Sequence, residues 1–240
     1  MRELVMLYGV LSYLSFLAVM VYLVAFVGDF LVPKTVSSGV VGEVTTALII
    51  NICLIILWGI QHSVMARSWF KEAIVKIVPQ HTERSTYVLL SAIVLAIVMY
   101  GWQPMEGVIW EVNNPFWQII IWVLFALGWI VATLSTFLTD HFDLFGLRQT
   151  WLYFVKKSYT SVKFTERLFY HWVRHPMMLG TLMAFWATPV MTLGHLVFSL
   201  GMTVYVLMGI YFEEKALAKS IGSVYVEYQK RTSKIIPGIY

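Results

Sequence analysis

Long apolar runs constrain this chain more than any other feature of its sequence. A helix that spans a bilayer needs about 20 mostly apolar residues. Four runs meet this length, and a fifth, interrupted by turn-compatible residues at 188–189 and 192–195, is long enough for two helices. The sequence therefore predicts an all-α, polytopic membrane protein with about six transmembrane helices, five and a helical hairpin being the alternative. The runs are Leu4–Val27, Val44–Met65, Tyr87–Trp102 with its flanks, Phe116–Leu138 and Met177–Phe212.

The composition argues against an ordinary soluble domain. Of the residues, 59% are hydrophobic and 12% are charged, against roughly 25% charged in soluble proteins. A lipid bilayer can accept that much apolar surface. The net charge of +4 suits an anionic inner leaflet or an anionic cofactor better than nucleic acid, so no nucleic-acid partner is expected. Cys53 is the only cysteine, which excludes an intramolecular disulfide or thiolate cluster. The first apolar run is too long for a signal peptide and is expected to remain as a helix.

Basic residues predict the orientation of the helices. If the N-terminus is cytoplasmic and six helices alternate, 16 of the 17 basic residues fall inside and only Lys34 falls outside. This distribution follows the positive-inside rule, so both termini are expected in the cytoplasm. The inside set is Arg2, Arg67, Lys71, Lys76, Arg84, Arg148, Lys156, Lys157, Lys163, Arg167, Arg174, Lys215, Lys219, Lys230, Arg231 and Lys234.

We expect a single membrane domain over residues 1–240, with four transmembrane helices in 1–138 and the functional half in 139–240. The segments Asp140–His175 and Glu213–Tyr240 are too short to fold alone and should form a cap on the inner ends of the helices. No G-x-G-x-x-G motif is present, so a Rossmann-type cofactor site is not supported.

The strongest chemical motif is Arg174-His175-Pro176, followed by Gly180. A proline suits the first turn of a helix, and the free amides of that turn, beside a guanidinium and an imidazole, favour a carboxylate or phosphate. Gly180 would let a ligand or a neighbouring helix approach closely. The alternative is that the basic pair only marks the membrane border.

A second motif, Glu213-Glu214, stands at the inner end of the last apolar run. Adjacent acids can accept hydrogen bonds from ribose hydroxyls or an amino group, or pair with Arg174. Tyr225 and Tyr228 are three residues apart, so they share a helical face and could flank a purine. The competing interpretation of this tail is an amphipathic helix on the membrane surface.

Together these motifs resemble the C-terminal signature of the isoprenylcysteine carboxyl methyltransferase superfamily, whose members are membrane-embedded and use S-adenosylmethionine. Within it the chain is most similar to the bacterial methanethiol S-methyltransferases, which make dimethyl sulfide. The resemblance covers about Trp58 to Pro237. Further matching segments are residues 61–67 (QHSVMAR), 83–87 (ERSTY), 139–149 (TDHFDLFGLRQ), 169–180 (FYHWVRHPMMLG), 184–189 (AFWATP) and 191–192 (MT).

The resemblance implies that residues 139–240 bind S-adenosylmethionine and that the protein lies in the bacterial inner membrane. Met177-Met178 departs from the aromatic residue that many relatives carry after the proline; two thioethers would suit a small sulfur substrate, or only fill space. The substrate residues are expected to be Ser63, Arg67, Met177, Met178 and Trp186. The expected cofactor residues are Tyr170, His171, Arg174, His175, Pro176, Gly180, Glu213, Glu214, Tyr225, Tyr228 and Arg231.

Methylation of a thiol requires a proton acceptor, because free thiols are mostly protonated at neutral pH. The candidates are Asp140, His141 and Asp143 after the fourth run, and His62 after the second. Asp140 and Asp143 would share a face if that helix continues. The alternatives are that these acids cap the helix and pair with Arg148 or Arg67, and that His62 belongs to a buried hydrogen-bonded pair. A metal site at His171 and His175 is disfavoured by Pro176 and by the charge of Arg174.

Three functions remain open from the sequence. The first is methylation of methanethiol. The second keeps the fold and cofactor but takes a larger lipidic thiol, carboxylate or amine. The third, a transporter or assembly factor, predicts a polar path that reaches both faces of the membrane, whereas the polar residues here gather on the inner side. The partners expected are a small thiol and the bilayer, with no obligate protein partner.

Overall fold

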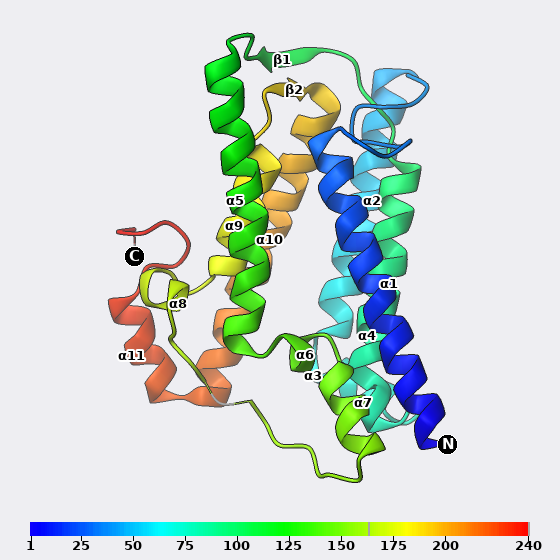
Figure 1. Cartoon of the computed structure of the whole chain (residues 1–240), viewed down its shortest axis with the longest axis vertical. Coiled ribbons are helices and arrows are strands. Elements are labelled where there is room, and N and C mark those ends of the chain that lie inside the picture. Colours follow the sequence, from blue (N-terminus) through cyan, green and yellow to red (C-terminus); the bar gives the residue numbers. More distant parts are fainter. Residues whose placement is uncertain (163, 240) are drawn as a thin grey trace. The chain divides into compact units, whose positions relative to one another are not determined.

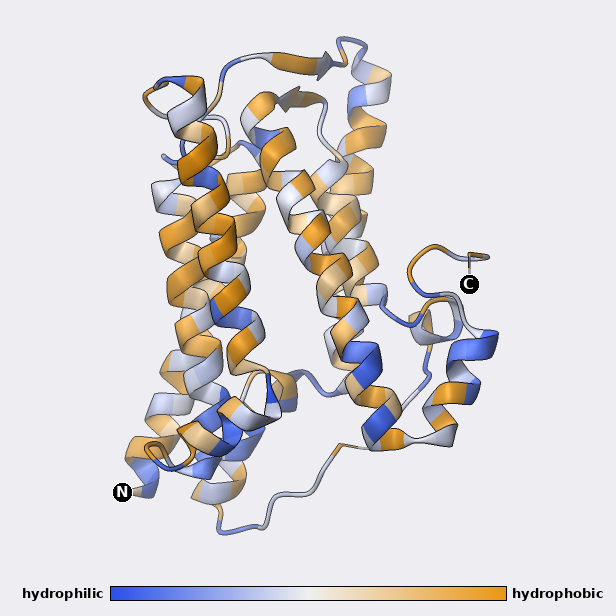
Figure 2. Cartoon of the chain, turned by 180° about the vertical axis from the view of Figure 1, so that it is seen from behind, coloured by the Kyte–Doolittle hydropathy of each residue, from blue (hydrophilic) through white to orange (hydrophobic). Residues whose placement is uncertain are grey.

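A computed structural model describes residues 1–162 and 164–239 of the chain. Five of its helices are long and apolar enough to cross a membrane (Figure 1): α1 (Arg2–Gly28), α2 (Val44–Met65), α4 (Gln80–Gly101), α5 (Pro115–Thr139) and α10 (Leu193–Ile221). Hydrophobic residues predominate in the middle of these helices, and hydrophilic residues appear toward their ends (Figure 2). The all-α, polytopic membrane class is confirmed.

The chain divides into two compact units, which are named here unit 1 and unit 2. Unit 1 contains Met1–Glu106 and Asp140–Val162, and unit 2 contains Gly107–Thr139 with residues 164–239. This division differs from the expected boundary after residue 138, because α5 belongs with the C-terminal helices and the segment that follows it belongs with the N-terminal ones.

Unit 1 is built on α1, which packs against α4 and against α7 (Leu147–Phe154), while α2 also packs against α4. The contact with α7 is close: a side chain at Gly9 would meet the Thr150 hydroxyl at 2.2 Å. The rings of Phe16 and Phe145 stack at 4.0 Å. Two short helices, α3 (Ser68–Ile74) and α6 (His141–Leu144), complete the unit.

Unit 2 pairs α5 with α9 (Pro176–Trp186) in antiparallel packing. Gly128 and Gly180 meet at the crossing, where a side chain on Gly180 would lie 2.5 Å from the Gly128 carbonyl oxygen. Two short strands, β1 (Val108–Glu111) and β2 (Val190–Thr192), pair antiparallel at one end of the unit. The helices α8 (Phe169–Trp172) and α11 (Ser223–Arg231) lie at the other end (Figure 1).

The apolar region 177–212 folds as the expected hairpin, but its first arm is short. The break falls between Trp186 and Leu193, where the sequence placed it. Helix α9 has 11 residues, a rise of about 16 Å, against about 30 Å for a bilayer core. Among the described residues, five helices are long enough to span a membrane and α9 is the short arm of a hairpin. This arrangement is the alternative to six transmembrane helices that the sequence left open.

Basic side chains gather at one end of unit 1. Arg2 lies over the Tyr153 ring of α7 at 5.3 Å, and Arg84 Nε donates to the Leu144 carbonyl at 2.6 Å. Lys34 follows the opposite end of α1 and donates to the Ser38 carbonyl at 2.9 Å. This segregation agrees with the expected charge asymmetry of the unit. Of the predicted inside set, Lys163 lies outside the described residues.

Candidate functional site in unit 2

The site is organised by a tail that returns to the start of α9. After α11 the chain forms a parallel bridge between Ser233 and Val173. The amide of Arg174 donates to the Ser233 carbonyl at 2.8 Å, and the amide of His175 donates to the Lys234 carbonyl at 3.2 Å. Pro176 then begins α9, where its missing N–H leaves no hydrogen bond unmade. The extended segment before the proline is thereby held against the tail.

A buried ionic network joins this segment to α10. Arg174 Nε lies 2.6 Å from Glu214 Oε1, and His175 Nε2 lies 3.1 Å from the same oxygen. Arg174 also donates to the carbonyls of Gln229, at 2.9 Å, and Thr232. The predicted pairing of Arg174 with the glutamate pair is confirmed, through Glu214. The carboxylate expected beside Arg174 and His175 thus comes from the chain itself.

The two adjacent glutamates face different surroundings. Glu214 is buried, with 10% of its side-chain surface exposed, and Lys234 Nζ lies 3.8 Å from its second oxygen. Glu213 has 47% of its side-chain surface exposed and contacts His175 Nδ1 through Oε2 at 3.6 Å. His175 therefore lies between two carboxylates, only one of which is open to a ligand.

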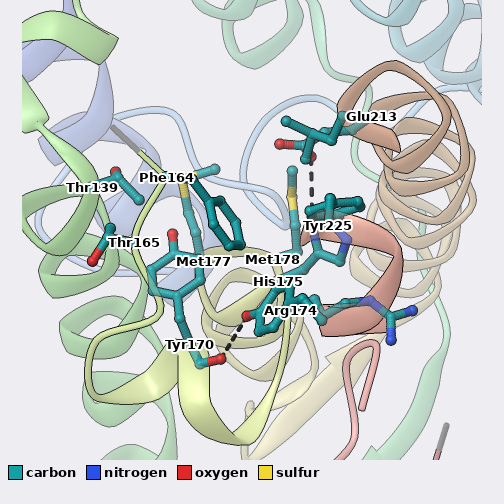
Figure 3. A pocket seen from close by; sticks show the side chains of 12 residues that line it. Thr139, Phe164, Thr165, Tyr170, Arg174, His175, Met177, Met178, Glu213 and Tyr225 are labelled. Atoms are coloured by element: carbon teal, nitrogen blue, oxygen red, sulfur yellow. Dashed lines mark hydrogen bonds and ion pairs between the residues drawn. The ribbon is translucent and has the colours of Figure 1, made fainter. Parts of the chain in front are cut away.

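Glu213 opens onto a cavity of about 190 Å³, seen from close by in Figure 3. Tyr225 and Tyr228 both line it, with ring centroids 5.8 Å apart, which confirms that they share a face of α11. The Phe164 ring makes a T-shaped contact with each tyrosine ring, with centroids 5.9 and 5.3 Å apart. The full lining is Thr139, Phe164, Thr165, Tyr170, Arg174, His175, Met177, Met178, Glu213, Leu217, Tyr225 and Tyr228.

The tyrosine hydroxyls of the cavity hold their protons. Burial, with Glu213 nearby, raises the pKa of Tyr170 to about 12. Burial likewise raises the pKa of Tyr225, to which Glu214 and Glu213 add, and of Tyr228, to which Glu166 adds. Tyr228 donates its hydroxyl hydrogen to the Tyr170 carbonyl at 2.5 Å. These hydroxyls can donate hydrogen bonds at neutral pH but cannot serve as bases.

Several expected cofactor and substrate residues of unit 2 lie elsewhere. His171 is exposed on α8 and does not line the cavity. Gly180 packs against α5, which explains its small size without a ligand. Arg231 Nη2 binds both oxygens of Glu166, at 2.8 and 2.6 Å. Trp186 donates to the Thr203 hydroxyl at 3.0 Å, at the far end of α9. Pro176 is buried and starts α9.

Four lining residues were missed by the sequence interpretation: Thr139, Phe164, Thr165 and Leu217. Phe164 and Thr165 lie in an irregular segment, where no periodicity marks a side chain as inward. The alternation of aromatic and basic residues through Asp140–His175 was the signal available for Phe164. Thr139 ends α5, and an apolar residue such as Leu217 looks like ordinary helix packing.

The acids proposed as bases form a separate network in unit 1. Helix α5 ends at Thr139, and Asp140 instead caps α6 by accepting from the Asp143 amide at 3.0 Å. The shared helical face expected for the two acids is therefore wrong. Arg148 holds both, 2.7 Å from Asp143 and 3.7 Å from Asp140, which confirms the pairing alternative. Arg148 also donates to the Thr160 carbonyl at 2.8 Å.

The two histidine candidates of unit 1 are engaged by tyrosines. His141 is buried, and its Nε2 lies 2.7 Å from the Tyr13 hydroxyl. His62 lies 2.7 Å from the Tyr87 hydroxyl, as expected for a hydrogen-bonded polar pair. The expected substrate residues of this unit, Ser63 and Arg67, lie at the end of α2 and at the start of α3. Among the described residues, no group of three or more His, Cys, Asp or Glu side chains is placed to hold a metal ion.

Residues 50–237 match the family described as NnrU protein. This chain belongs to the NnrU protein family. The matched region includes the Arg-His-Pro segment, both glutamates and α11, so the family match covers the whole cavity of unit 2. No solved structure matches the chain.

Related proteins carry two different names. A methanethiol S-methyltransferase of Mycobacterium tuberculosis is 44% identical over 236 residues, 98% of this chain and 97% of that protein. A methanethiol S-methyltransferase of Crocosphaera subtropica is 45% identical over 238 residues, 99% of this chain and 93% of that protein. A Nurim of Xenopus laevis is 28% identical over 166 residues, 65% of this chain and 57% of that protein. The resemblance to methanethiol S-methyltransferases seen in the sequence is confirmed.

Proposed function

We propose that this NnrU family protein transfers a methyl group from S-adenosylmethionine to methanethiol, forming dimethyl sulfide within the membrane. The observation that carries the proposal is identity of 44% and 45% with proteins named for this reaction, over almost the entire length of both chains. Because the alignments with these two proteins cover 98% and 99% of this chain, they include the motifs of both units and not one shared segment alone.

The cavity of unit 2 fits the proposed cofactor. Glu213 offers an anion to a positively charged ligand, and the edges and faces of Phe164, Tyr225 and Tyr228 offer an aromatic wall to a base. Arg174 and His175 would shape the site through Glu214. Bound there, S-adenosylmethionine would supply a methyl group on a positively charged sulfur. That sulfur leaves as a neutral thioether and is therefore a good leaving group. The chain must then orient the acceptor and exclude water, and alignment alone can lower a barrier by about 7–11 kcal/mol.

A small sulfur acceptor suits the lining of the cavity. Met177, Met178 and Leu217 supply its apolar wall. Polarisable thioethers suit contact with a sulfur atom. A larger lipidic thiol, carboxylate or amine is the second candidate, and it would require an opening between helices wide enough for an acyl or prenyl chain.

We further propose that the cavity lies at the cytoplasmic boundary of a bacterial inner membrane. Helix α10 has 29 residues, a rise of about 44 Å, so it exceeds a bilayer core of about 30 Å. Glu213 follows about 20 residues of helix, which is where such a core would end. Lys215 and Lys219 follow Glu213 in α10, Lys230 lies in the last turn of α11 and Lys234 follows that helix, as the positive-inside rule requires of a cytoplasmic face.

The direct test uses purified protein in lipid nanodiscs with methyl-labelled S-adenosylmethionine. Labelled dimethyl sulfide in the headspace after addition of methanethiol is the expected result. Cofactor binding without volatile product would favour the larger acceptor, to be tested with a prenylated thiol in the same nanodiscs. Absence of cofactor binding by calorimetry would remove both candidates.

A further inference from the structure

The glutamate pair of α10 divides into a structural and an open carboxylate. Glu214 is committed to Arg174 and His175 at 2.6 and 3.1 Å and is 10% exposed, whereas Glu213 is 47% exposed and lines the cavity. Successive residues of a helix point about 100° apart, so the two adjacent acids lie in different surroundings, although the imidazole of His175 contacts both. The sequence motif therefore carries two functions.

Elimination leaves few proton acceptors on the cavity wall. Tyr170, Tyr225 and Tyr228 retain their hydroxyl hydrogens at neutral pH, because burial raises their pKa values. Arg174 is a permanent cation. His175 lines the wall, but its two ring nitrogens face Glu214 at 3.1 Å and Glu213 at 3.6 Å. Among the described lining residues, Glu213 is the acceptor with an open face (Figure 3).

The acids of unit 1 are less suited to this task. Asp143 is held by the Arg148 guanidinium at 2.7 Å and accepts from the Tyr159 hydroxyl at 3.3 Å. Asp140 is used as the cap of α6. Both carboxylates are therefore already engaged by partners within unit 1. Among the residues that the structure describes, the ion pair recorded for Glu213 is the one with the imidazole of His175, at 3.6 Å.

We propose that Glu213 is the catalytic residue that takes the proton from the thiol acceptor, an inference that rests on the proposed methyl transfer. The S–H bond of the acceptor breaks and its proton passes to a Glu213 carboxylate oxygen. The acceptor sulfur forms its bond to the methyl carbon, and the bond from that carbon to the donor sulfur breaks, leaving its electron pair on the donor. Glu213 then releases the proton to water, so atoms and charge balance.

The apolar wall makes this assignment chemically useful. Met177, Met178 and Leu217 line the cavity beside Glu213, and a weakly polar surrounding disfavours an isolated anion. A thiol held against this wall would find the Glu213 carboxylate as its neighbouring proton acceptor. The charged and titratable groups facing Glu213 are His175, Arg174, Tyr170, Tyr225 and the adjacent Glu214.

The test compares two acceptors that differ in acidity, methanethiol and methaneselenol. A selenol is already ionised at neutral pH and requires no base. We expect Glu213→Gln to slow turnover of methanethiol at pH 7 by about 10²–10⁴-fold and to change turnover of methaneselenol by less than about 10-fold. The thiol rate of the variant should rise about tenfold for each pH unit, as the thiolate fraction grows. Both rates are compared at saturating cofactor, because Glu213→Gln also removes the anion that the cavity offers to the cofactor.

Two further variants complete the design. Glu227→Gln removes an acid from an exposed ion pair with Lys230 and should leave both rates unchanged. Glu213→Asp keeps the charge and draws it back from the cavity, so it should lose part of the thiol rate and none of the selenol rate. This variant replaces Glu213→Gln if the latter does not fold.

Equal slowing with both acceptors, or a loss of cofactor affinity with unchanged turnover at saturation, would overturn the role of Glu213 as proton acceptor. Absence of methylated product from the wild-type protein would overturn the proposed methyl transfer, and the role of Glu213 with it. Methylated product from the wild-type protein supports the proposed methyl transfer. Slower turnover of methanethiol than of methaneselenol by Glu213→Gln supports the role of Glu213 as proton acceptor.

Discussion

A single buried carboxylate, Glu214, balances the charges around it. It binds Arg174 and His175 through one oxygen, and Lys234 lies 3.8 Å from the other. Replacing one member of a buried ion pair leaves the other charge without compensation, which is destabilising by about 3–5 kcal/mol. Because Arg174 also holds the carbonyls of Gln229 and Thr232, its release should loosen the tail that follows α11.

We therefore expect Glu214→Gln to lower the thermal midpoint of the protein in nanodiscs and to weaken cofactor binding as well. Glu227→Gln is the matched control, because the pair with Lys230 is 66% exposed on both sides and such pairs are worth about 0–1 kcal/mol. The measurement is thermal unfolding followed by helical circular dichroism. Equal midpoints for the two variants would show that the network around Glu214 does not stabilise unit 2.

His141 gives a pH dependence to unit 1. Burial lowers the pKa of its imidazole, and Asp140 nearby offsets this only in part. The unfolded chain therefore takes up a proton at this site at higher pH than the folded protein does, so stability should fall as the pH decreases below about 6.5. His141→Gln should flatten the decline of the thermal midpoint between pH 7 and pH 5. A parallel decline in both proteins would assign the acid sensitivity to other groups.

At the scale of the helices, α5 and α9 approach closely through two glycines. A side chain on Gly180 would lie 2.5 Å from a backbone oxygen and 2.6 Å from the amide nitrogen of Ala132. Backbone atoms cannot rotate away, so Gly180→Ala should separate the helices and destabilise the protein by about 1–3 kcal/mol. Thermal unfolding and cofactor affinity measure the effect.

Gly209 is the control for this change. It also lies within a long helix, α10, but a side chain there would meet nothing within 4 Å. Gly209→Ala should therefore leave stability unchanged or raise it by about 0.5–1 kcal/mol, through the better helix propensity of alanine. Similar destabilisation by both changes would mean that the close crossing is not what Gly180 provides.

The elements that were predictable are those with a strong local signal. Helix α2 spans Val44–Met65 as the apolar run does, and α1, α4, α5 and α10 lie where their runs lie. The pairing of Arg174 with the glutamate pair was one of the alternatives that the sequence offered, and the structure has it through Glu214. Tertiary arrangement set the rest: α5 ends one residue before Asp140, and Gly180 faces a helix instead of a ligand. The spacing of residues in the sequence predicts neither the end of α5 nor the neighbour of Gly180.

The split between Glu213 and Glu214 shows the same limit. The sequence identified two adjacent acids, and their different exposure follows only from the side of α10 that meets Arg174. Phe164 illustrates it further, since its contact with Tyr225 and Tyr228 depends on the path of an irregular segment. Periodicity predicts which face of a helix is apolar, but it does not predict which loop covers it.

At the scale of the whole molecule, the remaining prediction is the orientation of the chain in the membrane. The only native cysteine is Cys53 within α2, so a Cys53→Ser background allows cysteines to be placed singly. Gly42→Cys precedes α2 where a side chain meets nothing within 4 Å. Ser220→Cys lies exposed in the last turn of α10. Neither position belongs to the cavity wall.

In intact cells, a membrane-impermeant maleimide should label the cysteine at position 42 and should label that at position 220 only after the inner membrane is permeabilised. The physical reason is the anionic cytoplasmic leaflet and the membrane potential, which retain basic segments inside, and the end of α10 carries Lys215 and Lys219. The reverse labelling pattern would place Glu213 and its cavity on the outer face. A cofactor made in the cytoplasm would then have no direct access, so this one measurement bears on both the orientation and the proposed reaction.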